Sequence, residues 1–272
     1  MINKELIRLA FTEDLHEIGD VTSQAIFTDE ESNYKLFAKD SGILCGIDLF
    51  QEVFHTLDKD VKFELFFTDG NRINKGDLIA NISGKVLSML QAERVALNFL
   101  SNLSAIATKT NKFVQAAEGK CKILDTRKTL PGYRKLQKYA VKCGGGENHR
   151  MGLYDMVMIK DNHHDAAGGI TNAVQKVRSK WQNRFKIEVE TRNLEEVKEA
   201  IECGVDIIML DNMSNEEMKK CVDYIAGRAL VEASGNMNLQ RIADVAETGV
   251  DYISVGALTH TVEAFDFSLR KK

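Results

Sequence analysis

Residues 187–210 read IEVETRNLEEVKEAIECGVDIIML, and this stretch decides the fold. A short apolar run is followed by a segment with helical periodicity (193–204) and then by a second short apolar run. Four such strand candidates begin about 20 residues apart, which predicts βαβ units around a parallel sheet. The full set of strand candidates is KILDT (122–126), MVMIK (156–160), IEVET (187–191), DIIML (206–210), ALVEA (229–233) and YISVG (252–256).

The ends of these strand candidates carry charged, hydroxyl or glycine residues. Side chains two apart on a strand share a face, so Met158 lies with Lys160 and Met209 with Asp211. In α/β barrels and open α/β sheets, the functional site lies at the carboxyl ends of the strands. Charges are rarely buried without pairing or function. We therefore expect one site ringed by strand ends, rather than a purely structural network of ion pairs.

The N-terminal third of the chain has a different pattern of apolar residues and turn signals. Residues 1–87 hold short apolar runs broken by turn signals such as Asp69-Gly70, which is typical of antiparallel strands and hairpins. Residues 14–23 are expected to form a loop. The capping-box spacing at Ser88 predicts the start of a long helix. Arg94 points away from the apolar stripe of that helix and is free to reach another group.

Composition excludes several classes of protein. The chain has 272 residues and a net charge of −4, which argues against a general nucleic-acid binder. No apolar run approaches the roughly 20 residues that cross a bilayer, and the N-terminus is not a secretory signal. The five cysteines are dispersed, which favours reduced thiols in the cytoplasm. Cys143 precedes three glycines, but no Cys/His signature accompanies it, so we expect a structural role.

The most specific stretch is ILDTRKTLPGYRKLQKYAVKCGGGENHRMGLYDMVMIKDNH (123–163). It closely resembles the central signature of quinolinate phosphoribosyltransferases. Further motifs of the same family follow in the right order along the chain, which is far stronger evidence than a lone glycine pattern. They are GDVTS (19–23), AERVALNFLSNLS (92–104), EVET (188–191), IMLDNM (208–213), VEASGN (231–236) and ISVGALTH (253–260).

The resemblance implies an α/β fold with two domains. An incomplete, open α/β barrel would cover 105–264, and an N-terminal α/β sandwich would cover 1–104 and include the tail 265–272. The implied reaction converts quinolinate and 5-phosphoribosyl 1-diphosphate to nicotinate mononucleotide, carbon dioxide and diphosphate, in de novo NAD synthesis. The family also implies a homodimer in which Arg94 reaches the neighbouring subunit's site.

Quinolinate carries two carboxylates on adjacent ring carbons, and arginine suits carboxylates because its fork bonds both oxygens. Four cationic residues close together in the sequence supply a matching set: Arg127, His149, Arg150 and Lys160. We therefore expect these four, with Arg94 by resemblance, to bind quinolinate.

The second substrate implies magnesium, since a hard cation accompanies diphosphate and prefers oxygen ligands. By resemblance, Glu190 and Asp211 serve this metal, through water or by touching the ribose hydroxyls. Lys128 and Lys160 are further cations for the leaving diphosphate. Backbone N–H groups of two loops are expected to bind the 5′-phosphate: Ser234, Gly235 and Asn236, then Val255, Gly256 and Ala257. Asn236 stands where the family commonly has a second glycine, so the role of its side chain stays open.

Three alternatives remain at this stage. A related phosphoribosyltransferase-like protein of the type associated with molybdate transport would use a different acceptor. A non-catalytic protein could keep the fold as a nucleotide or phosphate sensor. An aldolase could form a Schiff base at Lys160. The complete cation set argues against the first, and that set together with Glu190 and Asp211 argues against the second. Borohydride trapping with candidate carbonyl substrates would test the third.

Overall fold

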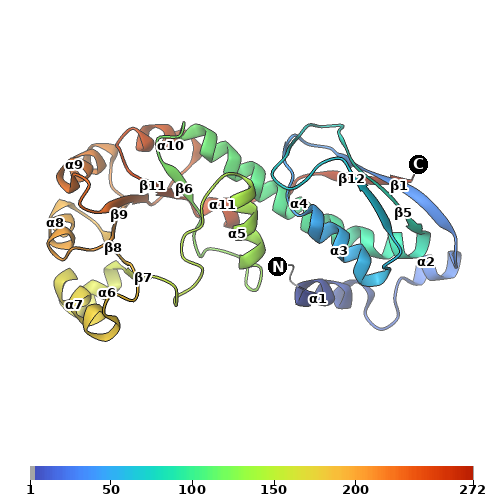
Figure 1. Ribbon diagram of the computed structural model, residues 1–272, viewed down its shortest axis with the longest axis horizontal. Helices are drawn as coiled ribbons and strands as arrows, with labels where there is room; N and C mark the ends of the chain where they lie inside the picture. The colour runs from blue at the N-terminus through green and yellow to red at the C-terminus, as the bar shows by residue number, and fades with distance from the viewer. Residues whose placement is uncertain (1–3, 272) are drawn as a thin grey trace. The chain divides into compact units, whose positions relative to one another are not determined.

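A computed structural model of the chain describes residues 4–271, which fold into two compact units (Figure 1). Unit 1 holds the chain up to Asn111, the excursion Leu130–Gly145, and the chain from Thr261 onward. Unit 2 holds Lys112–Thr129 and Gly146–His260. The boundary expected after residue 104 falls inside a continuous helix, α4 (Val86–Ala116). The excursion, which we had assigned to the barrel, packs with unit 1 instead.

Unit 1 is built on a four-stranded antiparallel sheet of order β12-β1-β5-β3. The sheet includes the C-terminal strand, which pairs with β1, so the tail joins the N-terminal domain as expected. Its strands are β1 (Glu31–Ala38), β3 (Lys62–Leu65), β5 (Leu78–Lys85) and β12 (Phe267–Lys271), and a separate pair is formed by β2 (Gly42–Ile43) and β4 (Arg72–Ile73).

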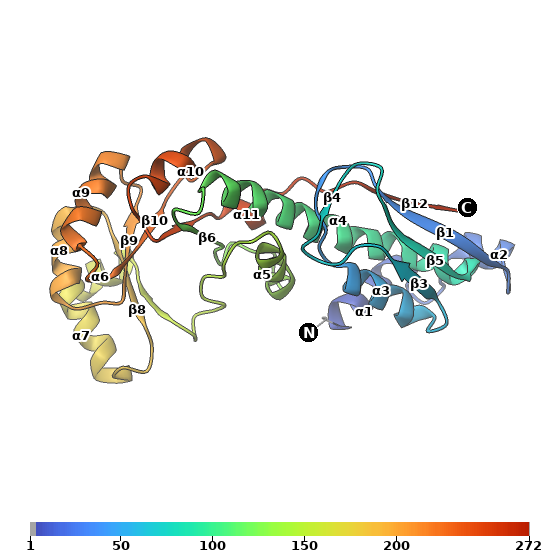
Figure 2. The same cartoon turned by 45° about the horizontal axis from the view of Figure 1, so that its top comes forward.

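Helices α3 (Ile47–Leu57) and α4 lie alongside this sheet (Figures 1 and 2). In α3 the apolar residues recur at helical spacing, and Phe50 and Phe54 pack against Phe63 of β3. The remaining helices of unit 1 are α1 (Lys4–Leu15), α2 (Val21–Ile26) and α5 (Arg134–Cys143).

Two local expectations for unit 1 were wrong. Helix α4 begins at Val86, and Ser88 donates its hydroxyl to Asp58 (2.9 Å) rather than capping the helix. Residues 14–23 are not a plain loop, because α1 runs to Leu15 and α2 begins at Val21. Asp20 starts α2 by accepting the backbone N–H groups of Thr22 and Ser23.

Unit 2 holds a six-stranded parallel sheet of order β6-β11-β10-β9-β8-β7, in the described part of the chain. The strands are β6 (Lys122–Leu124), β7 (Val157–Ile159), β8 (Ile187–Thr191), β9 (Ile207–Asp211), β10 (Leu230–Ser234) and β11 (Tyr252–Ser254). The helices are α6 (Asp161–Ala167), α7 (Ile170–Trp181), α8 (Leu194–Glu202), α9 (Asn215–Ile225), α10 (Leu239–Ala246) and α11 (Ala257–His260).

All six strand candidates are confirmed, and so is the open barrel. Strands β6 and β7 stand at the two edges of the described sheet and are not paired with each other. The parallel register aligns Glu190 with Met209 and Asp211 with Ser234. The carboxyl ends of the strands therefore meet along one edge, as the sequence predicts. Among the described residues, no helix is both long and apolar enough to cross a membrane.

Candidate active site

A cavity of about 930 Å³ opens at the carboxyl ends of the parallel strands, entirely within unit 2. The structure brings twelve of the predicted site residues together in its wall: Arg127, Lys128, His149, Arg150, Lys160, Glu190, Asp211, Ser234, Gly235, Asn236, Gly256 and Ala257. These residues come from the ends of all six strands and the loops that follow them, together with the loop before β7 that carries His149 and Arg150. The expectation of one site ringed by strand ends is confirmed as geometry.

The loops that carry Arg127 and His149 are fastened together at the end of β6. The backbone of Glu147 donates to Ile123 (2.8 Å) and accepts from Asp125 (3.2 Å), which extends the sheet by one bridge. The carboxylate of Asp125 is fully buried and accepts the backbone N–H of His149 at 2.9 Å. Asp125 thus positions the cationic loop without lining the cavity.

Arg150 is half-buried and held at two points. Its guanidinium donates to the carbonyl of Met156 (3.3 Å) and to the sulfur of Met158 (3.4 Å). Burial and the nearby charge of Arg127 lower the pKa of Arg150. Two guanidiniums that repel each other in a partly desolvated wall are stabilised by an anion between them. This part of the cavity is therefore suited to a carboxylate ligand.

His149 faces two buried carboxylates. Its Nε2 lies 3.1 Å from Glu188 and 3.4 Å from Glu232. Burial by itself lowers the pKa of His149, but the hydrogen bonds and charges of the two glutamates outweigh it and raise that pKa to about 10. However, Nδ1 accepts the backbone N–H of Arg150 at 2.7 Å, which a doubly protonated ring could not do. We therefore assign a neutral ring with its proton on Nε2.

The two glutamates share this ring in a region that solvent does not reach. Glu188 and Glu232 are 0% and 1% exposed. Burial, with the neighbouring charge of Glu232, raises the pKa of Glu188 to about 7. When two carboxylates lie side by side, the state in which one of them keeps its proton is more stable than the state in which both are ionised. Glu188 and Glu232 thus fix the orientation of the His149 ring at the cavity wall.

The acidic side of the cavity combines one salt bridge with one carboxylate from the next strand. Lys160 Nζ lies 2.9 Å from Glu190 Oε2, with the lysine side chain 45% exposed and the glutamate 10%. Asp211, at the end of β9, accepts the amide of Asn212 at 2.6 Å. Both carboxylates line the cavity and offer the oxygen ligands that a hard cation prefers.

The loop after β10 leaves bare backbone at the cavity wall. Gly235 has φ +93°, and a Cβ there would lie 2.2 Å from the side-chain oxygen of Asn212 and 2.8 Å from its backbone nitrogen. Only glycine fits this turn. Asn236 adopts φ +49° and donates to Asn212 at 3.2 Å, so asparagine accommodates the backbone at this position. Gly256 likewise leaves room, because a Cβ there would lie 3.0 Å from Lys128.

Two predicted residues lie elsewhere. Val255 is buried, and its backbone N–H donates to Leu124 (2.9 Å), so its expected role as a phosphate donor was wrong. Arg94 is exposed on α4 in unit 1, where it lines a separate cavity of about 340 Å³ together with Glu13 and Tyr133. In addition, His163 and His164, which follow Lys160 and match no zinc-ligand spacing, belong to α6, and His163 accepts the backbone N–H of Lys160.

Sequence reasoning gave no role to several residues that support the site. Nothing in the sequence joined Glu188 and Glu232 to His149. Asp125 was passed over, although it stands two residues before Arg127 at the end of a strand. Asn212, which shapes the Gly235 turn, directly follows Asp211 in the IMLDNM motif. For Asp125, Glu188 and Glu232 the available signal was a charged residue within or directly after an apolar strand candidate.

Models of known families match nearly the whole chain. Residues 20–104 match the N-terminal domain of quinolinate phosphoribosyl transferase, and residues 106–270 match its C-terminal domain. The chain belongs to the quinolinate phosphoribosyltransferase family. Its members are pentosyltransferases, and the α/β fold with an open parallel sheet agrees with this placement.

Relatives from plants and bacteria cover the chain almost completely. Quinolinate phosphoribosyltransferase [decarboxylating] 2, mitochondrial, from Nicotiana glauca is 45% identical, covering 98% of this chain and 81% of its own. A probable nicotinate-nucleotide pyrophosphorylase [carboxylating] from Bacillus subtilis (strain 168) is 42% identical, covering 98% and 92%. The crystal structure of nicotinate-nucleotide pyrophosphorylase from Ehrlichia chaffeensis superposes with a TM-score of 0.96 at 39% identity, covering 100% of this chain and 99% of that one.

Proposed function

We propose that the cavity of unit 2 transfers a phosphoribosyl group to quinolinate, giving nicotinate mononucleotide, carbon dioxide and diphosphate for NAD synthesis. One observation carries the proposal most directly. Arg127, His149, Arg150 and Lys160 line the same cavity as the carboxylates of Glu190 and Asp211. Family membership supports the same reaction.

The cationic wall is suited to the two carboxylates of quinolinate. Arg127 and Arg150 each offer a planar guanidinium that can donate two hydrogen bonds to one carboxylate. Burial and the charge of Arg127 lower the pKa of Arg150, so a bound carboxylate would stabilise its charged form. His149 is better suited to a positioning role than to that of a cation, because Nδ1 and Nε2 already meet Arg150 and the glutamate pair. Lys160 can leave Glu190 and turn to an incoming carboxylate, since nearly half of its side chain is exposed.

The acidic side is suited to ribose hydroxyls and to magnesium. Glu190 and Asp211 both line the cavity and so offer two carboxylates as a partial ligand set. Magnesium commonly combines one or two carboxylates with waters and substrate phosphates. When bound, the ion would neutralise the departing diphosphate. Lys128 and Lys160 supply further positive charge for that group.

The backbone at Ser234, Gly235 and Asn236 and at Gly256 and Ala257 is suited to the 5′-phosphate, because it lines the cavity with little side-chain cover. In the reaction, the ring nitrogen of quinolinate attacks C1 of the ribose as diphosphate leaves. The positive ring nitrogen then stabilises the carbanion that remains when the adjacent carboxylate departs as carbon dioxide. Positioning and electrostatics supply the acceleration, and the step needs no nucleophilic side chain.

We further propose a homodimer in which Arg94 completes the quinolinate site of the partner subunit. Arg94 is exposed, lies off the apolar stripe of α4, and is not part of the cavity wall in unit 2. Isologous dimers exchange equivalent residues in this way. A cytoplasmic location remains a prediction that rests on the five dispersed free cysteines.

The decisive experiment supplies purified protein with quinolinate, phosphoribosyl diphosphate and Mg²⁺ and measures both products. We expect equal amounts of carbon dioxide and diphosphate, and loss of both on chelation with EDTA. Folded protein that binds quinolinate but releases neither product would indicate a sensor. Failure to bind quinolinate at all would indicate the related protein with a different acceptor.

A further inference from the structure

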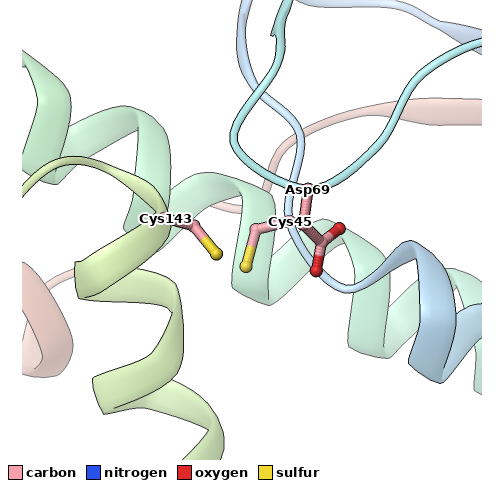
Figure 3. Close-up of side chains that lie close together, drawn as sticks. All are labelled: Cys45, Asp69 and Cys143. Carbon is pink, nitrogen blue, oxygen red and sulfur yellow. The ribbon is translucent and has the colours of Figure 1, made fainter.

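Two cysteines meet in unit 1, outside the cavity described above. Cys45 follows β2, and Cys143 is the last residue of α5, yet their sulfurs lie close together. Their sulfurs and an oxygen of Asp69 all lie within 4.8 Å of one another. Figure 3 shows the two sulfurs pointing toward each other, with the Asp69 carboxylate beside Cys45. All three residues belong to unit 1.

Both cysteines are fixed through the backbone to the same helix, α4. The N–H of Cys45 donates to the hydroxyl of Ser104 (3.0 Å), which in turn donates to the carbonyl of Cys45 (3.1 Å). Gly144, next to Cys143, packs so closely that a Cβ there would lie 2.4 Å from the carbonyl of Ala107. The backbone at Cys45 and the backbone next to Cys143 are therefore both packed against α4, and this packing keeps the two thiols close together.

The two thiols differ in access and environment. Cys45 is fully buried, whereas Cys143 is partly exposed. The hydroxyl of Tyr139 lies 2.7 Å from Asp69 and within hydrogen-bonding reach of Cys143. The hydrogen bond from Cys45, together with that from Tyr139, lowers the pKa of Cys143, while the hydrogen bond with Cys143 and burial raise the pKa of Cys45. An accessible, acidified thiol beside a buried one matches the arrangement of oxidisable cysteine pairs.

We propose that Cys143 and Cys45 form a reversible disulfide site that responds to peroxide. The Cys143 thiolate attacks one peroxide oxygen, the O–O bond breaks, and Cys143 becomes a sulfenic acid while the other oxygen leaves as water. The Cys45 sulfur then attacks the Cys143 sulfur, the S–O bond breaks, and a second water carries away the Cys45 proton. Two thiols lose two electrons, and one hydrogen peroxide becomes two waters.

The disulfide would replace a contact between two sulfurs that lie within 4.8 Å of each other by an S–S bond of about 2.05 Å. It would tie the end of α5 to the segment before α3. This crosslink would join parts of the chain far apart in sequence, which restricts the unfolded chain and raises the melting temperature. The inference does not depend on the proposed reaction, because both residues lie outside the catalytic cavity.

Limited hydrogen peroxide on the reduced protein tests the proposal. We expect loss of two of the five thiols, a Cys45–Cys143 peptide in mass spectrometry, a higher melting temperature, and full reversal by dithiothreitol. Cys143→Ser should leave Cys45 as a thiol. Cys45→Ser should stop Cys143 at the sulfenic acid, which dimedone traps. Cys203→Ser is the matched control and should form the disulfide as before.

A second variant separates chemistry from packing. Tyr139→Phe keeps the ring but removes the hydroxyl, so it should slow oxidation of Cys143 several-fold and leave the melting temperature of the reduced protein unchanged. Equal labelling of Cys121, Cys143 and Cys203 by peroxide, with no crosslinked peptide, would overturn the proposal. So would tight binding of Zn²⁺ through both thiols in the reduced protein that peroxide cannot displace.

Discussion

At the scale of single residues, Glu188 places its carboxylate where water cannot screen it, next to Glu232 and the ring of His149. Such a carboxylate binds a proton more tightly in the folded chain than in the unfolded chain. Its pKa rises from the ordinary value of 4.5 to about 7. The stability that this proton contributes is fully present below pH 4.5 and is lost as the pH rises through about 7.

Glu188→Gln should therefore flatten part of the pH dependence of stability. The wild-type protein should lose stability relative to the variant between about pH 5 and pH 7.5, by on the order of 3 kcal/mol at most. Thermal midpoints measured across that range for both proteins check this, with the exposed Glu263→Gln as control. A constant difference between wild type and Glu188→Gln at every pH would show that Glu188 stays ionised in the folded state.

Arg127 offers a direct test of the cationic wall. Arg127→Ala should raise the KM for quinolinate and lower kcat/KM by at least about 100-fold, since a bidentate charged contact is lost. The KM for phosphoribosyl diphosphate should change little. The exposed Arg72→Ala in unit 1 is the control and should be neutral in both assays. If Arg127→Ala instead lowers the melting temperature strongly with an unchanged KM, the residue has a structural role.

At the scale of elements, periodicity predicted most of the fold. Each of the six parallel strands was placed within two residues, because the apolar runs are too short for helices and alternate at regular spacing with helical segments. Helix starts were harder, as at Ser88, whose hydroxyl turns to Asp58. Val255 shows the same limit in the site, because its sequence position does not reveal that its N–H already belongs to Leu124.

The contact between α4 and α5 gives a prediction at this scale. Gly144 caps α5 with φ −76°, which alanine adopts without strain, yet a Cβ there would lie 2.4 Å from the carbonyl of Ala107 and 2.7 Å from Thr110 Cβ. The backbone of Ala107 and the branched side chain of Thr110 cannot move aside. Gly144→Ala should therefore destabilise the protein by about 1–3 kcal/mol. Denaturant unfolding measures this.

Gly152→Ala is the matched control for that substitution. The three atoms nearest to its new Cβ all belong to the ring of Tyr154, which is 72% exposed and can turn away. We expect its midpoint to stay near that of the wild type. Equal midpoints for the Gly144 and Gly152 variants would contradict the packing described for α4 and α5.

At the scale of the whole molecule, the proposed dimer predicts complementation between two inactive variants. Arg94→Ala and Arg127→Ala should each abolish quinolinate transfer. The first removes an arginine from the partner's site, and the second removes an arginine from the subunit's own site. In a mixed dimer, the Arg94→Ala subunit keeps its own Arg127 and receives Arg94 from its partner. That site is complete, while the other site of the same dimer lacks both arginines.

Random pairing after co-expression should make half of the dimers mixed, each with one working site, so about a quarter of wild-type activity should return. The measurement is kcat per subunit for the mixture, compared with each variant alone. If Arg94 instead served its own subunit, both kinds of site would lack one arginine in every dimer. The mixture would then stay as inactive as its components, and the trans arrangement would be excluded.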